Sequence, residues 1–88
     1  MDIDDWRKEI DEIDKKILQL LNKRTKCVIN IGKLKKQKGI SLYSAKREDE
    51  ILKLLLKQNK GPLEEINIRN IFEKIIDESK IIESKYCE

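Results

Sequence analysis

The stretch that decides the fold is WRKEIDEIDKKILQLLNKRTKCVINIGKL, residues 6–34. It contains no proline, and its apolar residues recur every three or four positions. This spacing is typical of one long amphipathic helix with a continuous apolar stripe. We call that stripe the seam; it consists of Trp6, Ile10, Ile13, Ile17, Leu20, Cys27, Ile31 and Leu34.

Arg24 interrupts the seam at a position where the spacing calls for an apolar residue. An arginine keeps its charge at any workable pH, and burying it without a partner is very costly. The side chain therefore has three options: it reaches water, it pairs with a buried glutamate, or it holds an anionic ligand. The last option points to a function.

The length of the first helix predicts the architecture. We expect the helix to run from about Asp5 to Lys38, capped by Asp4 or Asp5 and ended by Gly39. About 34 residues at about 1.5 Å each make a rod of about 50 Å, whereas a compact domain of this size is about 30 Å across. Because the rod extends beyond any single-chain fold, we expect an intertwined homodimer in which it packs against its symmetry mate.

Two shorter helices should follow. Ser44 is the predicted N-cap of a helix that ends near Asn59, and residues 60–62 (Lys-Gly-Pro) separate it from a third helix. The third helix should run from Leu63 or Glu64 to Tyr86. Its apolar side is expected to carry Ile68, Phe72, Ile75, Ile76, Ser79 and Ile82. Residues 1–88 thus make one all-α domain of three helices.

The composition argues against several classes of protein. The net charge is only +3, with 17 acidic residues interspersed, so nucleic-acid binding through the lysine run at 33–38 is not expected. No apolar run approaches the roughly 20 residues of a membrane span, and residues 2–5 lack the positive charge of a signal peptide. Cys27 and Cys87 do not suggest a disulfide framework, so we expect a cytoplasmic protein. Without histidine, a zinc site is not expected.

Other polar residues join Arg24 on the predicted apolar faces. Lys35 lies three helical turns further along nearly the same face, which leaves room for a small anion between the two cations. On the third helix, Ser79 and Glu83 are neighbours at i and i+4. Arg7 lies about 25 Å from Arg24 along the helix, so it can approach that region only from an antiparallel partner chain.

Each of these residues also has a purely structural interpretation. Lys35 belongs to a lysine-rich run, which is usually a solvated face, and Ser79 can bond back to its own backbone. Glu83 can border the apolar stripe, and an isolated arginine such as Arg7 is more often at the surface than on a ligand. Taken together, however, the residues favour a binding site, because cations on the first helix face a hydroxyl and a carboxyl group on the third.

The same residues carry a family resemblance. The segments 6–24 and 31–35 and the pair Arg47-Glu48 that opens the second helix resemble the all-helical chorismate mutases. The third helix adds Phe72, Ile75, Ile76, Ser79 and Glu83 to this resemblance. The resemblance covers nearly the whole chain. It implies an intertwined homodimer of three-helix chains that converts chorismate to prephenate, on the route to phenylalanine and tyrosine. It also implies a reaction without metal or cofactor, driven by conformational restraint and by stabilisation of charge on the ether oxygen.

The resemblance assigns the charged substrate groups to named residues. Arg24, with Arg7 from the partner chain, would bind the two carboxylates of chorismate, and Ser79 would assist. Lys35 would donate to the ether oxygen and help to hold a carboxylate. The resemblance implies that Arg24, Lys35 and Glu83 are the catalytic residues; the role of Glu83 is described below.

The remaining roles concern the ring hydroxyl and the walls of the site. By resemblance, Glu48 would accept a hydrogen bond from the ring hydroxyl, and Arg47 would support the site. Ser44 stands where family members often have aspartate, and its backbone would bind the same hydroxyl. Ile31 and Ile76 would form apolar walls.

Glu83 departs from the family pattern. It stands where many members have a glutamine that donates a second hydrogen bond to the ether oxygen. A carboxyl group donates only when it is protonated, so the activity should favour acidic pH unless apolar surroundings favour the proton. Lys35 nearby acts in the opposite direction.

Two alternative functions fit parts of this pattern. A lyase of the same fold that acts on isochorismate would share the cations and the architecture. A helical dimerisation module without catalysis would explain the seam and the long rod, but not an inward Arg24 opposite Ser79 and Glu83.

Overall fold

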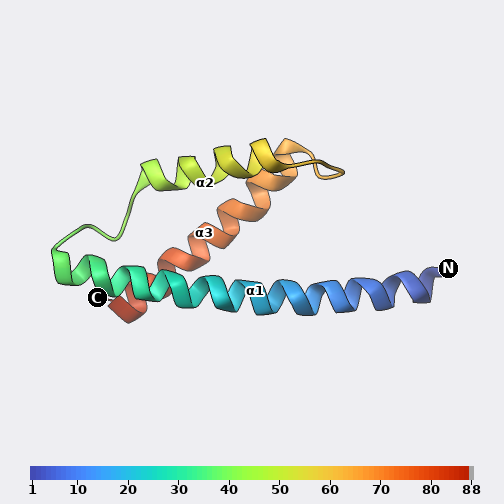
Figure 1. Ribbon diagram of the computed structural model, residues 1–88, viewed down its shortest axis with the longest axis horizontal. Helices are drawn as coiled ribbons and strands as arrows, with labels where there is room; N and C mark the ends of the chain where they lie inside the picture. Colours follow the sequence, from blue (N-terminus) through green and yellow to red (C-terminus); the bar gives the residue numbers. More distant parts are fainter. Residues whose placement is uncertain (88) are drawn as a thin grey trace.

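The computed structural model describes residues 1–87, which form three helices: α1 (Ile3–Lys38), α2 (Ala45–Gln58) and α3 (Glu65–Cys87) (Figure 1). This confirms the predicted all-α class with a very long first helix. In the described part of the chain, no helix is both long and apolar enough to cross a membrane.

The start of α1 corrects the prediction. The N-cap is Asp2, not Asp4 or Asp5: its carboxylate accepts a hydrogen bond from the backbone N–H of Asp5 at 3.0 Å, and the Asp5 carboxylate accepts one from the backbone N–H of Asp2 at 3.1 Å. This reciprocal capping box satisfies two N–H groups that otherwise lack partners, so the helix already begins at Ile3. The predicted end is confirmed, since Gly39 adopts the left-handed conformation with φ +66°.

The ends of the other helices follow from local hydrogen bonds. Ser44 caps α2 as predicted, because its hydroxyl accepts a backbone N–H of the first turn at 3.2 Å. Helix α3 begins at Glu65, slightly later than expected: the backbone N–H of Glu64 donates to the side chain of Asn67 at 2.9 Å, outside the helical ladder. It ends at Cys87, one residue beyond the prediction.

Helix α3 packs against both other helices and returns the chain to the C-terminal half of α1 (Figure 1). The close approach of α1 and α3 depends on Gly32, which is buried. A Cβ at this position would lie 2.5 Å from Sγ of Cys87 and 2.9 Å from Cγ of Glu83. Only a residue without a side chain allows α3 to come this close to α1 at residue 32. The side chain of Glu83 therefore packs directly against α1.

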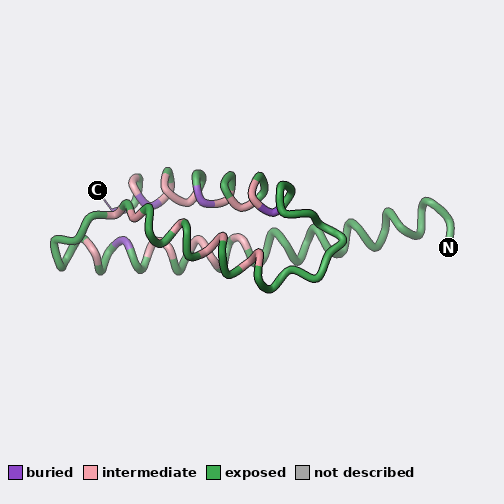
Figure 2. Tube along the Cα trace, turned by 90° about the horizontal axis from the view of Figure 1, so that it is seen from above, coloured by how far each residue is buried: buried purple, intermediate pink, exposed green. Residues whose placement is uncertain are grey.

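The seam is exposed in the single chain. Trp6, Ile10 and Ile13 are more than half exposed, and the N-terminal part of α1 extends beyond the other helices (Figure 2). The molecule measures 54 × 24 × 16 Å, in agreement with the predicted rod. The apolar side chains that are buried among residues 1–87 are Ile68, Ile76 and Cys87. So small a core leaves the apolar stripe of α1 without a cover.

Candidate active site

A pocket of about 650 Å³ lies between the C-terminal half of α1, the connection 39–44, the start of α2 and the C-terminal half of α3. All the predicted site residues except Arg7 line it, namely Arg24, Lys35, Ser44, Arg47, Glu48, Ser79 and Glu83. The predicted apolar walls, Ile31 and Ile76, line it as well. Residues that are far apart in the sequence thus meet at one place.

Arg24 spans the gap between α1 and α3. Its Nη1 donates to Oγ of Ser79 at 2.6 Å, and that hydroxyl donates to the backbone carbonyl of Ile75 at 2.7 Å. Ser79 therefore bonds back to its own helix and also holds the arginine. Within the described residues the partner of Arg24 is a neutral hydroxyl and not a buried glutamate. The guanidinium keeps its full charge, and its fork of five N–H donors is only partly used.

Lys35 lies half-buried on the pocket wall. Its Nζ donates to the backbone carbonyl of Leu42 at 2.9 Å, which ties the connection 39–44 to the helix. An ammonium group carries three N–H donors, so this bond uses one of them. The lysine is therefore a fixed part of the site and not one more member of a solvated run.

Glu83 is buried, with 9% of the residue exposed, and it lines the pocket one turn after Ser79. Its position follows from the contact with Gly32, because the missing side chain at residue 32 makes room for the stem of the glutamate. The predicted neighbourhood of Ser79 and Glu83 is therefore confirmed. Both face the same pocket as Arg24 and Lys35.

Ser44 and Arg47 border the pocket at the start of α2. The hydroxyl of Ser44 is engaged as the helix cap, accepting the backbone N–H of Arg47. The Arg47 guanidinium is largely exposed, and its Nη1 lies 3.7 Å from a carboxylate oxygen of Glu50. Neither side chain is tightly held by the rest of the site, which fits a supporting position at its edge.

Lys80 is a pocket residue that the sequence reasoning missed. Its Nζ lies 2.8 Å from Oε1 of Glu48 and 4.5 Å from the ring centroid of Tyr43. The hydrogen bond to Glu48 raises the pKa of Lys80 above its ordinary value, and desolvation opposes this only in part. A signal was present in the sequence, because Ile76, Lys80 and Glu83 occupy positions i, i+4 and i+7 of one helix face.

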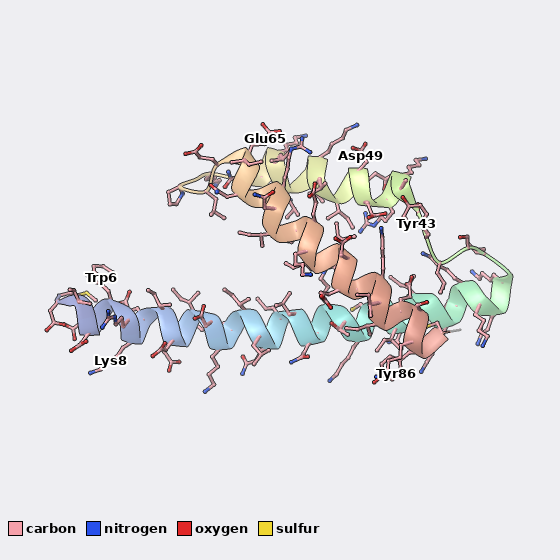
Figure 3. All side chains as sticks on the ribbon, turned by 180° about the vertical axis from the view of Figure 1, so that it is seen from behind. Trp6, Lys8, Tyr43, Asp49, Glu65 and Tyr86 are labelled. Carbon is pink, nitrogen blue, oxygen red and sulfur yellow. The ribbon has the colours of Figure 1, made fainter. Side chains whose placement is uncertain are left out.

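Arg7 lies outside the pocket. It is exposed, with Nη1 at 3.8 Å from a carboxylate oxygen of Asp4 in its own helix. Figure 3 shows its neighbour Trp6 at the free end of α1, whereas Tyr43 lies at the opposite end of the molecule, beside the start of α2. Within one chain, Arg7 is therefore remote from the other predicted site residues.

The charges of the pocket suit a small anion. The lining cations are Arg24, Lys35, Arg47 and Lys80, against the carboxyl groups of Glu48 and Glu83. Converging N–H donors of this kind bind carboxylates and stabilise negative charge that develops on an oxygen. Among the described residues, no cluster of histidine, cysteine and acidic side chains has the grouping that a metal ion needs.

Comparisons with known proteins agree with this geometry. The family model of chorismate mutase type II matches residues 6–84. The chorismate mutase of Methanocaldococcus jannaschii is 37% identical over 86 residues, which cover 93% of this chain and 84% of that protein. The bifunctional chorismate mutase/prephenate dehydratase of Aquifex aeolicus is 34% identical over 96% of this chain, but the match covers only 24% of its own length.

Solved structures of chorismate mutases share the fold of this chain. The structure of chorismate mutase (form II) from Thermus thermophilus superposes with a TM-score of 0.94 at 36% identity, covering 98% of both chains. The form I structure from the same source covers 88% of this chain with a TM-score of 0.86. This chain therefore belongs to the type II chorismate mutase family.

Proposed function

We propose that the pocket is where this chain, a chorismate mutase by family, rearranges chorismate to prephenate. The observation that carries the proposal is the convergence of Arg24, Lys35, Ser79 and Glu83 from two helices on one pocket. A pericyclic rearrangement needs no nucleophile. It needs the substrate held in its reactive conformation and charge stabilised on the breaking ether bond.

Each group in the pocket suits one part of this task. The guanidinium of Arg24, fixed by Ser79, would bind one carboxylate in a bidentate manner. Lys35 and protonated Glu83 would donate to the ether oxygen, where negative charge develops. These two roles are supported by the position of Lys35 on α1 and of Glu83 on α3, because both side chains line the same cavity.

The start of α2 would bind the other side of the substrate. Glu48 would accept a hydrogen bond from the ring hydroxyl, and the backbone of Ser44 would serve the same group. Arg47 would add positive charge at the edge of the pocket. Ile31 and Ile76 would exclude water from the apolar face of the ring.

We infer that the active form is a homodimer in which Arg7 of one chain completes the site of the other. The exposed seam supports this inference, because a second copy of α1 offers a matching apolar surface. A second, largely apolar cavity of about 470 Å³ between α1 and α3, with Arg24 in its wall, offers further surface for a partner. The substrate has two carboxylates, and a second arginine from the partner would pair with the second one.

We also infer that residues 1–88 act as one domain in the cytoplasm. The family match over residues 6–84 supports a single domain. Cys27 and Cys87 both carry free thiols, which suits a reducing compartment.

The test of the function is an assay of the purified chain with chorismate. The absorbance of chorismate should fall, and prephenate should be the product. Release of pyruvate from isochorismate would instead support the lyase. If neither substrate is consumed by the folded protein, the chain is a dimerisation module without catalysis.

The test of the assembly is analytical ultracentrifugation at micromolar concentration. The protein should sediment as a dimer, because burial of the seam drives association. A stable monomer that retains full activity would contradict the shared site.

A further inference from the structure

We propose that Lys80 is a positioning residue that holds the carboxylate of Glu48 toward the ring hydroxyl of the substrate. The inference rests on the proposed function, because it uses the role of Glu48 as the acceptor for that hydroxyl. Its basis is the contact of 2.8 Å between Nζ of Lys80 on α3 and Oε1 of Glu48 on α2, at the wall of the pocket.

This ion pair differs from surface pairs in the same molecule. Lys53 and Asp49 also meet at 2.9 Å, but they lie one turn apart in α2, and their side chains are 75% and 62% exposed. The side chains of Lys80 and Glu48 are 41% and 24% exposed, and they join two helices. Exposed pairs within one helix contribute little, whereas a partly buried pair between elements fixes the geometry of both partners.

Lys80 is itself held from a second side. Its Nζ lies 4.5 Å from the ring centroid of Tyr43, within the range of a cation–π interaction. Tyr43 belongs to the connection between α1 and α2, so the ring, the amine and the carboxylate come from three segments of the chain. Such convergence restricts the rotamers of Glu48 before any substrate arrives.

The charge balance gives Lys80 a second effect on the same carboxylate. The proposed substrate is a dianion, and an unpaired Glu48 in the pocket would repel it. Lys80 offsets this repulsion and leaves acceptor positions on the carboxylate, which offers about four lone-pair sites. A lysine amine is charged at neutral pH, and the hydrogen bond to Glu48 raises the pKa of Lys80 further.

The experiment compares kcat/KM for the full-length wild type, Lys80→Met, Glu48→Gln and the double variant. We expect Lys80→Met to lose roughly tenfold, the scale of one charge-assisted hydrogen bond. In the Glu48→Gln background the same change should cost less than about twofold, because Lys80 acts through the carboxylate. Lys80→Arg should restore most of the rate, since it keeps the charge and the donors.

Lys53→Met is the matched control, because it removes the same type of side chain from an ion pair of similar length outside the pocket. It should leave kcat/KM unchanged. Circular dichroism and thermal unfolding establish that each variant is folded at the assay temperature. If Lys80→Met does not fold, Lys80→Gln replaces it, and the same loss is expected because the charge is absent.

Two outcomes overturn the proposal while wild-type activity stands: an unchanged rate in Lys80→Met, or losses that multiply in the double variant. The second result would mean that Lys80 contacts the substrate directly. Wild-type protein that forms no prephenate would instead contradict the proposed function, so the two failures are distinguishable.

Discussion

Among the individual side chains, Arg24 shows how a single tertiary contact distinguishes a structural role from a functional one. A permanent charge within an apolar stripe has several structural explanations, and a buried glutamate partner is the simplest of them. The structure instead provides a neutral hydroxyl at 2.6 Å. A hydroxyl orients the guanidinium without neutralising it, so the charge remains available to an anion.

We therefore expect Arg24→Ala to lower kcat/KM by about 10²–10³-fold, the scale of one charged contact to a transition state. The fold should persist, because the substitution leaves no unpaired charge behind. Steady-state kinetics and circular dichroism measure the two effects. Arg69→Ala is a suitable control, since that arginine pairs with Glu65 outside the pocket. Full activity of Arg24→Ala would refute its assignment as a substrate ligand.

Glu83 governs the expected pH dependence. Its carboxyl donates to the ether oxygen only when protonated, so the wild-type rate should fall as the pH rises. Glu83→Gln donates at every pH and should therefore be faster at neutral to alkaline pH, with a flatter pH–rate profile. Glu73→Gln, at an exposed position of the same helix, should leave the profile unchanged. If Glu83→Gln is no faster above neutral pH, Glu83 does not donate to the reacting oxygen.

Among the helices, the crossing of α1 and α3 places the catalytic groups. Gly32 permits the crossing, and the stem of Glu83 fills the space beside it. Cys87 stabilises the same crossing, because its Sγ donates a hydrogen bond to the backbone carbonyl of Ile29 on α1 at 3.4 Å. The distance between the two helices thus fixes where Glu83 stands in the pocket.

Gly32→Ala should accordingly damage both stability and catalysis. Overpacking costs about 1–3 kcal/mol, and the better helix propensity of alanine returns about 1 kcal/mol. The net loss should be about 1 kcal/mol, with a clear fall in kcat because Glu83 must move. Chemical denaturation and kinetics give the two numbers.

Making the same substitution in the Cys87→Ala variant separates the effect on stability from the effect on kcat. In Cys87→Ala the nearest atom to the new methyl group is gone, so Gly32→Ala should cost less stability there, while kcat should still fall because Glu83 Cγ remains at 2.9 Å. Unchanged kcat in both backgrounds would show that the crossing does not position Glu83.

For the entire chain, the central question is how the exposed seam is covered. The N-terminal part of α1 extends beyond the other helices (Figure 2), Trp6 lies at its free end (Figure 3), and Trp6 and Ile10 are both more than half exposed. Arg7 lies on the same extension, remote from the pocket of its own chain. A second copy that covers this extension would also bring the Arg7 of each chain toward the pocket of the other chain.

A mixed dimer tests this arrangement. Arg7→Ala and Arg24→Ala homodimers should each be nearly inactive, because every site in them lacks one arginine. A dimer that combines one chain of each kind should contain one intact site, built from the Arg24 of one chain and the Arg7 of the other. Mixing the two inactive proteins under conditions of subunit exchange should therefore restore activity. No recovery in a verified mixed dimer would contradict a site shared between chains.

Local chemistry explains which features were predictable from the sequence. The regular spacing of the seam predicts α1, and the caps Ser44 and Gly39 predict helix ends because capping involves residues within one turn. The N-cap of α1 was misplaced because Asp2, Asp4 and Asp5 are chemically equivalent caps. Only the geometry of the reciprocal hydrogen bonds distinguishes them.

The sequence by itself determined the three helices, the face on which Arg24 and Lys35 lie, and the neighbourhood of Ser79 and Glu83, because helical periodicity is a local property. Only the tertiary structure decided that Arg24 meets Ser79 and that Lys80 meets Glu48. These contacts depend on how α3 crosses the other helices and on where the connection 39–44 lies. The spacing within one helix carries no information about either, since both follow from packing between segments far apart in the chain.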